Sequence, residues 1–262
     1  MISKQKVGII VISRMQSTRL PGKALRKIGK YYSLELCVLN CKKVKNADQV
    51  ILATTKLKRD KILIQKFKKK LNIFAGESKD VLKRMLDACK KFKFTDVVRV
   101  TGDCPFISSN IIEILIKNHK KEKADITIAK NAAAGTYGEV YKIKALNEIF
   151  LKSRSTKYSE YLPYYFLHNK KKFKIKKINL PSRLIRNYRI TLDYKKDLLM
   201  FNEMIKKSIK KTKDLMTIDI FKILDQNPKI ANINSGLRLK YINKNFQKKL
   251  KKFTRLSKWK KN

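Results

Sequence analysis

Acidic residues are scarce in this sequence of 262 residues: 20 aspartates and glutamates stand against 65 lysines and arginines, and the formal net charge at pH 7 is +45. Such an excess of cations can give affinity for nucleic acids, because cations that approach a polyphosphate release its counterions. Here the cations are mostly lysine, are spread along the chain, and come without a zinc-knuckle or aromatic RNA-binding motif. We therefore expect no nucleic-acid partner, and keep a basic nucleic-acid-binding protein only as the least favoured alternative.

Cysteines and long apolar runs are also few. The four cysteines show no CxxC pair and no disulfide-rich spacing, so we expect buried free thiols in a reducing compartment and neither a disulfide framework nor a zinc site. The first apolar run, residues 7–12, is too short for a secretory signal. No stretch approaches the roughly 20 apolar residues that span a bilayer. The sequence thus predicts a cytoplasmic protein without membrane insertion.

Glycine (8 residues) and proline (5) are few as well, and no repeat or Gly/Ser-rich linker divides the chain. Hydrophobic residues make up 43% of it, which suffices for a sizeable core at this length. We therefore expect one domain, residues 1–244, followed by a basic C-terminal tail, residues 245–262, that forms a helix or a frayed end.

What is present is an alternation of two hydrophobic patterns. Short β-branched runs at residues 7–12, 49–53 and 96–100 predict buried strands, and segments with helical spacing lie at residues 34–44, 62–71 and 81–92. This alternation predicts an α/β fold with three α/β/α layers around a mainly parallel, Rossmann-like sheet. Further along we expect a helix at 111–123, strands at 125–129 and 139–143, a helix from 145, an edge strand at 173–180, a short strand at 189–192 and a helix from 195. Ligands of such sheets bind beyond the carboxyl ends of the strands, so the residues that follow the strands are the candidates for a site.

The loop after the first predicted strand reads SRMQSTRLPGK, residues 13–23. It contains neither a Walker A pattern nor a GxGxxG fingerprint. Guanidinium groups bind phosphate oxygens as a fork, an ammonium binds them as a point charge, and the backbone of such a loop can form an anion-binding nest. The candidate nucleotide-binding residues are therefore Arg14, Ser17, Arg19, Gly22 and Lys23. From the residue types alone, an exposed basic turn is an equally good alternative.

Two carboxylates are expected beyond other strands. Asp103 follows the strand at 96–100 in a Gly-Asp turn, and Asp193 follows the strand at 189–192. A carboxylate that faces a phosphate-binding loop can hold a Mg²⁺ ion that bridges nucleotide phosphates. Asp103 could instead cap the helix that follows or stabilise its own turn. Together with the loop, the two acids point to metal-dependent nucleotidyl transfer.

With these residues assembled, the chain resembles the cytidylyltransferase family, which includes the CMP-sialic acid and CMP-Kdo synthetases and the nucleotidyltransferases of the spore-coat polysaccharide type. Residues 13–23 match the family pattern A-R-x-x-S-x-R-L-P-G-K, with serine in place of the first alanine. Further segments are similar to those of the family, most closely of the spore-coat branch: GESKDVLKRMLDA (76–88), RVTGDCP (99–105), GEVYKIKAL (138–146), YRITLDYKKDL (188–198) and NPKIANIN (227–234). The resemblance implies a nucleotidyltransferase sheet of the GT-A-like kind.

The resemblance also implies roles for the candidate residues. The loop residues would hold the triphosphate of CTP, and Asp103 and Asp193 would coordinate Mg²⁺. A sugar hydroxyl would attack the α-phosphate and release pyrophosphate, a step that depends on alignment and charge neutralisation. Lys23, Asp103 and Asp193 are thus the predicted catalytic residues. Arg84 and Asp80 are further candidates for nucleotide contact, and an exposed salt-bridged helix start explains this pair equally well.

Departures from the family pattern leave the sugar open. SEYLPYYF (159–166) keeps Glu160 but has Tyr161 where the branch often has histidine, and AAAGTYGEV (132–140) lacks the aspartate usual in that loop. Glu139 and Glu160 are the predicted substrate-binding residues. Four basic residues are possible partners of a sugar carboxylate: Lys142, Arg183, Arg186 and Arg189.

The function that we predict is transfer of CMP from CTP to an acidic sugar, for surface polysaccharide or glycan synthesis. The alternative is a non-catalytic nucleotide-binding protein of the same fold, and the presence of both aspartates together with Lys23 argues against it. The resemblance alone suggests a homodimer.

Overall fold

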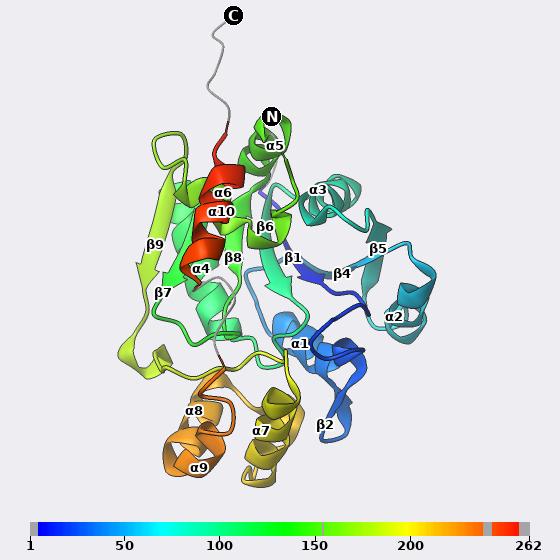
Figure 1. Ribbon diagram of the computed structural model, residues 1–262, viewed down its shortest axis with the longest axis vertical. Helices are drawn as coiled ribbons and strands as arrows, with labels where there is room; N and C mark the ends of the chain where they lie inside the picture. Colours follow the sequence, from blue (N-terminus) through cyan, green and yellow to red (C-terminus); the bar gives the residue numbers. More distant parts are fainter. Residues whose placement is uncertain (1–4, 154, 238–242, 257–262) are drawn as a thin grey trace, which may run out of the picture.

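The computed structural model describes residues 5–153, 155–237 and 243–256. Seven strands form a central sheet in the order β5-β4-β1-β6-β8-β7-β9 (Figure 1). Their bounds are β1 Val7–Ile12, β4 Gln49–Thr55, β5 Asn72–Gly76, β6 Asp96–Thr101, β7 Ile126–Lys130, β8 Glu139–Lys142 and β9 Ile175–Asn179. Only β8 runs antiparallel to its neighbours in this sheet. The predicted mainly parallel sheet is confirmed.

Helices cover both faces of the sheet (Figure 1). Their bounds are α1 Ser33–Lys42, α2 Lys61–Phe67, α3 Val81–Phe92, α4 Ser109–Glu122, α5 Ile143–Lys152, α6 Pro163–Leu167, α7 Lys195–Lys206, α8 Thr217–Gln226, α9 Pro228–Ala231 and α10 Lys244–Thr254. One apolar core joins α1, α2 and α4 to one face, and another joins α3, α5 and α6 to the other. Successive residues of β1 alternate between these cores, as side chains of a strand must. The three predicted layers are therefore present.

A third core lies beside the sheet, where α7, α8 and α9 pack together at the lower end of Figure 1. It includes Leu20 from the loop after β1 and Leu192 from the segment before α7. A small hairpin, β2 Lys27–Ile28 with β3 Tyr31–Tyr32, contributes the buried Ile28. This core fixes both segments that carry candidate site residues.

One predicted strand is wrong. Residues 189–192 form no strand of the sheet, and only a single bridge joins Arg189 to Ala134. Instead the segment lies across the loops: Ile190 N donates to Ala134 O at 2.7 Å, and Leu192 N donates to Asp103 O at 2.8 Å. Its apolar residues pack into the third core and not against the sheet. The segment therefore has the apolar pattern of a buried strand although it forms none.

Two boundaries near α2 also differ from expectation. The helix ends at Phe67 and not at residue 71, because the chain turns there: Lys70 N and Leu71 N both donate to Phe67 O. The turn allows residues 72–76 to run as β5 beside β4, an edge strand that the hydrophobic pattern did not indicate. Only the last residue of β5 is fully buried.

The C-terminal segment forms the helix α10 in its described part. Leu250 and Thr254 are buried where α10 meets α6, and the Phe246 ring lies 4.9 Å from that of Tyr161, centroid to centroid. The lysines of α10 stay exposed. In the described part of the chain no helix has the length and apolar character needed to cross a bilayer.

Candidate active site

The loop after β1 is held in one conformation by the strands around it. Ser13 N donates to Ala53 O at 3.1 Å, and Met15 N donates to the buried carboxylate of Asp60 at 2.7 Å. Gly22 has φ 65°, in the left-handed region that glycine adopts without steric cost. The cations of the loop are therefore presented from a fixed backbone.

Lys23 lies between two carboxylates. Its Nζ is 2.5 Å from Oδ2 of Asp103 and 2.9 Å from Oδ1 of Asp193. Arg19 Nη2 lies 2.5 Å from the same Oδ1, and its guanidinium stands over the ring of Tyr194. The structure thus brings together three segments that are far apart in the sequence.

Asp103 reaches this cluster because β6 lies next to β1. The register pairs Ile12 with Thr101, and Gly102 N donates to Ile12 O at 2.8 Å. A Cβ on Gly102 would lie 2.8 Å from the Cβ of Ser13, so a larger residue would push the two loops apart. The carboxylate is therefore placed by strand pairing and by the close approach of two turns.

The charges of the cluster stabilise one another. Burial lowers the pKa of Lys23, but Asp103 and Asp193 outweigh it, so the pKa lies above its usual 10.5. Burial likewise raises the pKa of Asp103, but the Lys23 ammonium outweighs it and holds the pKa below the usual 3.8. Lys23 and Asp103 are both charged at neutral pH.

Glu139 and Glu160 both accept hydrogen bonds from Arg99, a residue that was not among the candidates from the sequence. Arg99 Nε donates to Glu139 Oε2 at 3.0 Å, and its Nη1 donates to the backbone O of Glu160 at 2.8 Å. Arg14 Nη2 donates to the Glu160 carboxylate at 2.8 Å. Both partners of this last pair are well exposed, so it contributes little to stability. The sequence signals for Arg99 were a charged residue inside the apolar run of β6 and its place at the start of the segment RVTGDCP.

Ser17 and Arg84 lie outside the carboxylate cluster. Ser17 Oγ accepts from Leu20 N at 3.3 Å, which closes a local turn. Arg84 is 1% exposed and donates to the backbone O of Glu77. The alternative of an exposed salt bridge is therefore wrong for Arg84, because it lies on the inner side of α3, against β5.

Asp80 caps α3, a role that the sequence did not predict for it. Its side chain accepts a hydrogen bond from Lys83 N at 3.0 Å. It therefore acts at the helix start, and within the described ranges it forms no hydrogen bond or ion pair with the cluster around Lys23.

The basic residues considered for a sugar carboxylate are scattered. Arg189 Nη2 lies 2.8 Å from Asp193 Oδ2, and Arg186 is paired with Asp225 on α8 at 3.0 Å. Lys142 pairs in register with Asp96, at the end of β6 opposite to the cluster. Arg183 lies in a short 3-10 turn, Ser182–Leu184. Of these four residues only Arg189 belongs to the cluster, and there its guanidinium is paired with Asp193.

Asp103 and Asp193 are the candidate metal ligands. In the described ranges, no group of three or more His, Cys, Asp or Glu side chains could hold a metal ion. The two carboxylates nevertheless converge on one cation, the ammonium of Lys23. Mg²⁺ is commonly bound through one or two carboxylates, with waters and substrate phosphates completing its shell. The pair therefore fits a metal ion that binds together with a nucleotide.

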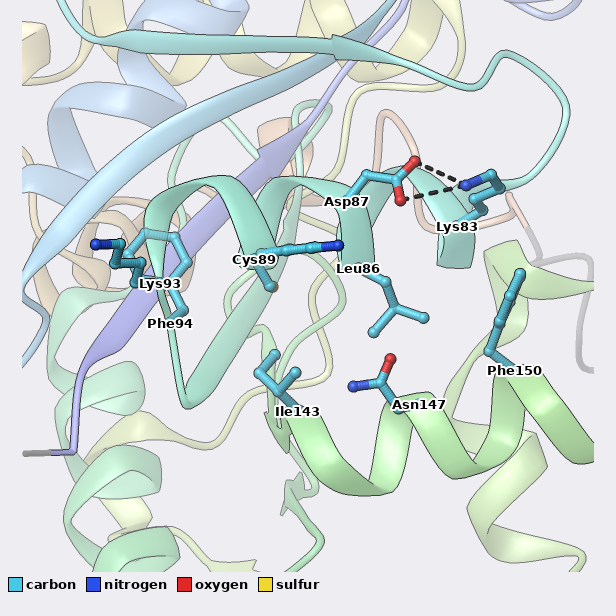
Figure 2. A pocket seen from close by; sticks show the side chains of 10 residues that line it. Lys83, Leu86, Asp87, Cys89, Lys93, Phe94, Ile143, Asn147 and Phe150 are labelled. Carbon is cyan, nitrogen blue, oxygen red and sulfur yellow. Dashed lines mark hydrogen bonds and ion pairs between the residues drawn. The ribbon is translucent and has the colours of Figure 1, made fainter. Parts of the chain in front are cut away.

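A pocket of about 350 Å³ lies elsewhere, between α3 and α5 (Figure 2). Leu86, Ile143, Asn147 and Phe150 line it, and Lys83 at its rim is paired with Asp87. Phe94, which also lines it, precedes β6, whereas Asp103 follows that strand. The pocket thus lies toward the opposite end of the sheet from the cluster and includes none of the candidate site residues.

A mainly parallel α/β sheet with a cationic loop after β1, and two carboxylates opposite that loop, is the arrangement of a nucleotidyltransferase. The chain belongs to the cytidylyltransferase family, whose model matches residues 8–248. It is therefore a nucleotidyltransferase of the cytidylyltransferase type.

Three similar proteins show how far the likeness extends. The spore coat polysaccharide biosynthesis protein SpsF of Bacillus subtilis is 28% identical over 229 residues, which are 85% of this chain and 95% of SpsF. The structure of a cytidylyltransferase from Leptospira borgpetersenii matches with a TM-score of 0.81 and 26% identity over 90% of this chain and 99% of that one. A CMP:2-keto-3-deoxy-manno-octonic acid synthetase complexed with CTP matches with a TM-score of 0.62 and 15% identity, over 78% of this chain and 99% of that one, and shows the fold alone.

Proposed function

We propose that the protein transfers CMP from CTP to a hydroxyl group of an acidic sugar, in a Mg²⁺-dependent reaction that releases pyrophosphate and serves the synthesis of a surface polysaccharide or glycan. The observation that carries this proposal is the position of Lys23, from the loop after β1, between Asp193 and Asp103, which follows the adjacent strand β6. The SpsF relative supports a role in polysaccharide synthesis. The fold neighbour that acts on a sugar acid and was solved with CTP supports an acidic acceptor.

Each charged group of the cluster has a task in this reaction. Arg14, Arg19 and Lys23 neutralise the triphosphate, and Asp103 and Asp193 would hold Mg²⁺. When bound, the metal ion supplies charge neutralisation at the phosphates. The oxygen of the sugar hydroxyl forms a bond to the α-phosphorus and loses its proton to solvent, while the bond from that phosphorus to the bridging oxygen of the β-phosphate breaks and pyrophosphate leaves. Alignment and charge compensation are the main contributions that the protein makes to such a step.

The pairs seen in the structure imply an exchange of partners when the nucleotide binds. Lys23 and Arg19 are held by the acids of the cluster, and Arg14 is held by Glu160. A triphosphate attracts these cations, and the carboxylates released in this way are then available to the metal ion. The nucleotide and the metal ion therefore favour each other's binding.

A pyrophosphate-release screen tests the proposed function. Four nucleoside triphosphates are combined with a panel of 2-keto sugar acids and neutral sugars, with and without Mg²⁺. We expect release with CTP, a sugar acid and Mg²⁺ together, and none when any one is left out. Binding of CTP without pyrophosphate release from any combination would favour the non-catalytic alternative, and turnover with neutral sugars alone would overturn the acidic acceptor.

Asp103→Asn tests the metal role of the cluster. We expect Mg²⁺-dependent turnover to fall to background, because the amide keeps the shape of the side chain but not its charge, while circular dichroism shows a folded protein. Asp87→Asn, which removes an exposed acid on α3, is the matched control and should leave turnover unchanged. Full activity in Asp103→Asn would remove Asp103 from the metal site.

A further inference from the structure

Asp197 is a buried acid that the reaction described above does not use. It lies in the first turn of α7 with no exposed surface, and it accepts hydrogen bonds from Asp193 N at 2.8 Å and Tyr194 N at 2.9 Å. Arg189 Nε donates to its Oδ1 at 2.9 Å. Its carboxylate therefore fixes the backbone of the very residue that carries a candidate metal ligand.

Asn234 closes the other side of this network. Its Nδ2 lies 2.9 Å from Oδ1 of Asp197 and 3.1 Å from the backbone O of Arg189, and the side chain is almost fully buried. Asn234 ends the segment NPKIANIN, which resembles a segment of the family but has had no role until now. The network thus ties residues 189–197 to a segment 37 positions further along the chain.

Arg189 links Asp197 to the side chain of Asp193. Its Nη2 donates to Oδ2 of Asp193 at 2.8 Å, with both side chains buried. The other oxygen, Oδ1, faces Lys23 and Arg19. The two oxygens of Asp193 are therefore not equivalent: one is bound by the protein, and the other faces the cations of the phosphate loop.

We propose that Asp197, Arg189 and Asn234 are positioning residues that hold Asp193 so that Oδ1 alone is presented to the metal ion. This inference rests on the proposed function. A carboxylate can bind a metal through one or both oxygens, and Mg²⁺ requires nearly ideal octahedral geometry. A carboxylate with one oxygen already taken can offer only single-oxygen coordination, which fits that requirement.

The energetics favour positioning over simple stabilisation. Removing paired charges from water costs free energy that their attraction often fails to recover, so buried ion pairs are weak evidence for stability. In addition, Nη1 of Arg189 is buried without a hydrogen-bond partner in the described part of the chain. A segment selected only for stability would gain from an apolar residue at this place, whereas orientation of Asp193 requires the guanidinium.

Binding of Mn²⁺ in the presence of CTP, with no sugar present, tests the proposal without turnover. Free Mn²⁺ is measured by electron paramagnetic resonance for the wild type and for Asp197→Asn. We expect roughly 10- to 100-fold weaker Mn²⁺ binding in the variant, the usual effect of removing a group that orients a metal ligand. With a sugar acceptor and Mg²⁺, kcat should fall while the KM for the sugar stays unchanged. Asp225→Asn is the matched control, because Asp225 pairs with Arg186 in an exposed position and should leave both measurements unaltered.

The outcomes separate this proposal from the proposed function. If the wild type does not bind Mn²⁺ together with CTP, both fail. If the wild type binds it and Asp197→Asn binds it equally well, with only the melting temperature lowered, Asp197 is structural and the positioning role is overturned. Should Asp197→Asn not fold, Asn234→Ala removes a single hydrogen bond to Asp197, and a severalfold weaker Mn²⁺ affinity is expected from it; an unchanged affinity would again overturn the proposal.

Discussion

Charge alone does not distinguish a functional lysine in this chain, because lysines are abundant; the residues that a lysine contacts do. Many lysines of the described surface are exposed, among them those of α10. Lys23 instead contacts two acids, Asp103 in the turn after β6 and Asp193 in the segment before α7. The two segments are joined by a hydrogen bond from Leu192 N to the backbone O of Asp103. The ammonium of Lys23 therefore lies at the place that we propose for the phosphates of the nucleotide.

Lys23→Met should weaken CTP binding strongly. The substitution keeps much of the side-chain volume and removes a charged donor, and a hydrogen bond to a charged group contributes about 1.5–3 kcal/mol, or roughly 10- to 150-fold in Kd. Titration of CTP by calorimetry measures the effect. Lys27→Met, an exposed lysine of the adjacent hairpin, should bind CTP like the wild type. An unchanged Kd in Lys23→Met would refute the role of the loop in phosphate binding.

The same variant has an expected pH dependence. The pKa of Asp103 is held below its usual 3.8 by Lys23 despite burial, so the stabilisation that it supplies is present above about pH 4 and is lost as the pH falls through the lowered pKa. In Lys23→Met the difference in unfolding free energy from the wild type should accordingly be largest near pH 7 and shrink toward pH 3, as urea unfolding would measure. The pKa of Lys23 lies above 10.5, so alkaline conditions up to that value leave the pair intact.

At the residue scale, the candidate site was predictable where local sequence carries it. Asp103 lies two residues after an apolar strand and Lys23 lies in the loop after another, and strand ends are where α/β folds bind ligands. Arg99 and Asn234 were given no role because the partners of their side chains lie 37 to 61 positions away and buried polar side chains have no local pattern. Asp193 was found for an incorrect reason, since the strand expected before it does not exist.

At the scale of elements, strands with a clear hydrophobic pattern were predicted better than strands at the edge of the sheet. The buried strands β1, β4 and β6 contain the short β-branched and apolar runs that are typical of strands covered on both faces. β5 is short, half exposed and follows a lysine-rich turn, so its sequence gives little sign of a strand. Residues 189–192 carry strand-like apolar residues that pack on helices instead, a tertiary effect that periodicity does not record.

The helix α10 connects the C-terminal segment to the site. Phe246 and Phe253 of α10 lie against the rings of Tyr158 and Tyr161, which flank Glu160. Glu160 in turn binds Arg14 and Arg99 through its carboxylate and backbone. The helix therefore supports one wall of the region where an acceptor would bind.

Leu250→Ala should destabilise the protein measurably. Leu250 is the fully buried leucine of α10, and leucine-to-alanine changes in a core cost about 2–5 kcal/mol. The melting temperature measured by calorimetry should fall, and the KM for the sugar should rise as the contact with Tyr161 loosens. Lys249→Ala, at an exposed neighbouring position, should stay within about 0.5 kcal/mol of the wild type. Equal stability of the two variants would show that α10 does not pack as described.

The net charge of +45 is spread over the whole molecule. Exposed lysines lie on α2, α4, α7 and α10, on both faces and at both ends of the sheet, and are not gathered on one element. A dispersed charge attracts any polyanion through the long-range field but allows few simultaneous phosphate contacts. The strong field thus favours the approach of anionic substrates without defining a nucleic-acid groove.

Double-stranded DNA should accordingly bind weakly and without consequence for the reaction. Because few phosphates are neutralised at once, the affinity is low from the start, and the binding seen by fluorescence anisotropy at about 50 mM salt should be lost by about 200 mM. Pyrophosphate release from CTP and the preferred sugar acid should be unaffected by DNA at the higher salt, since charges more than about 8 Å apart are then screened from each other. Replacing Lys251 and Lys252 together by glutamate should weaken DNA binding further and leave turnover unchanged, because these lysines are exposed on α10. DNA binding that persists at 200 mM salt and competes with CTP would instead support the nucleic-acid-binding alternative.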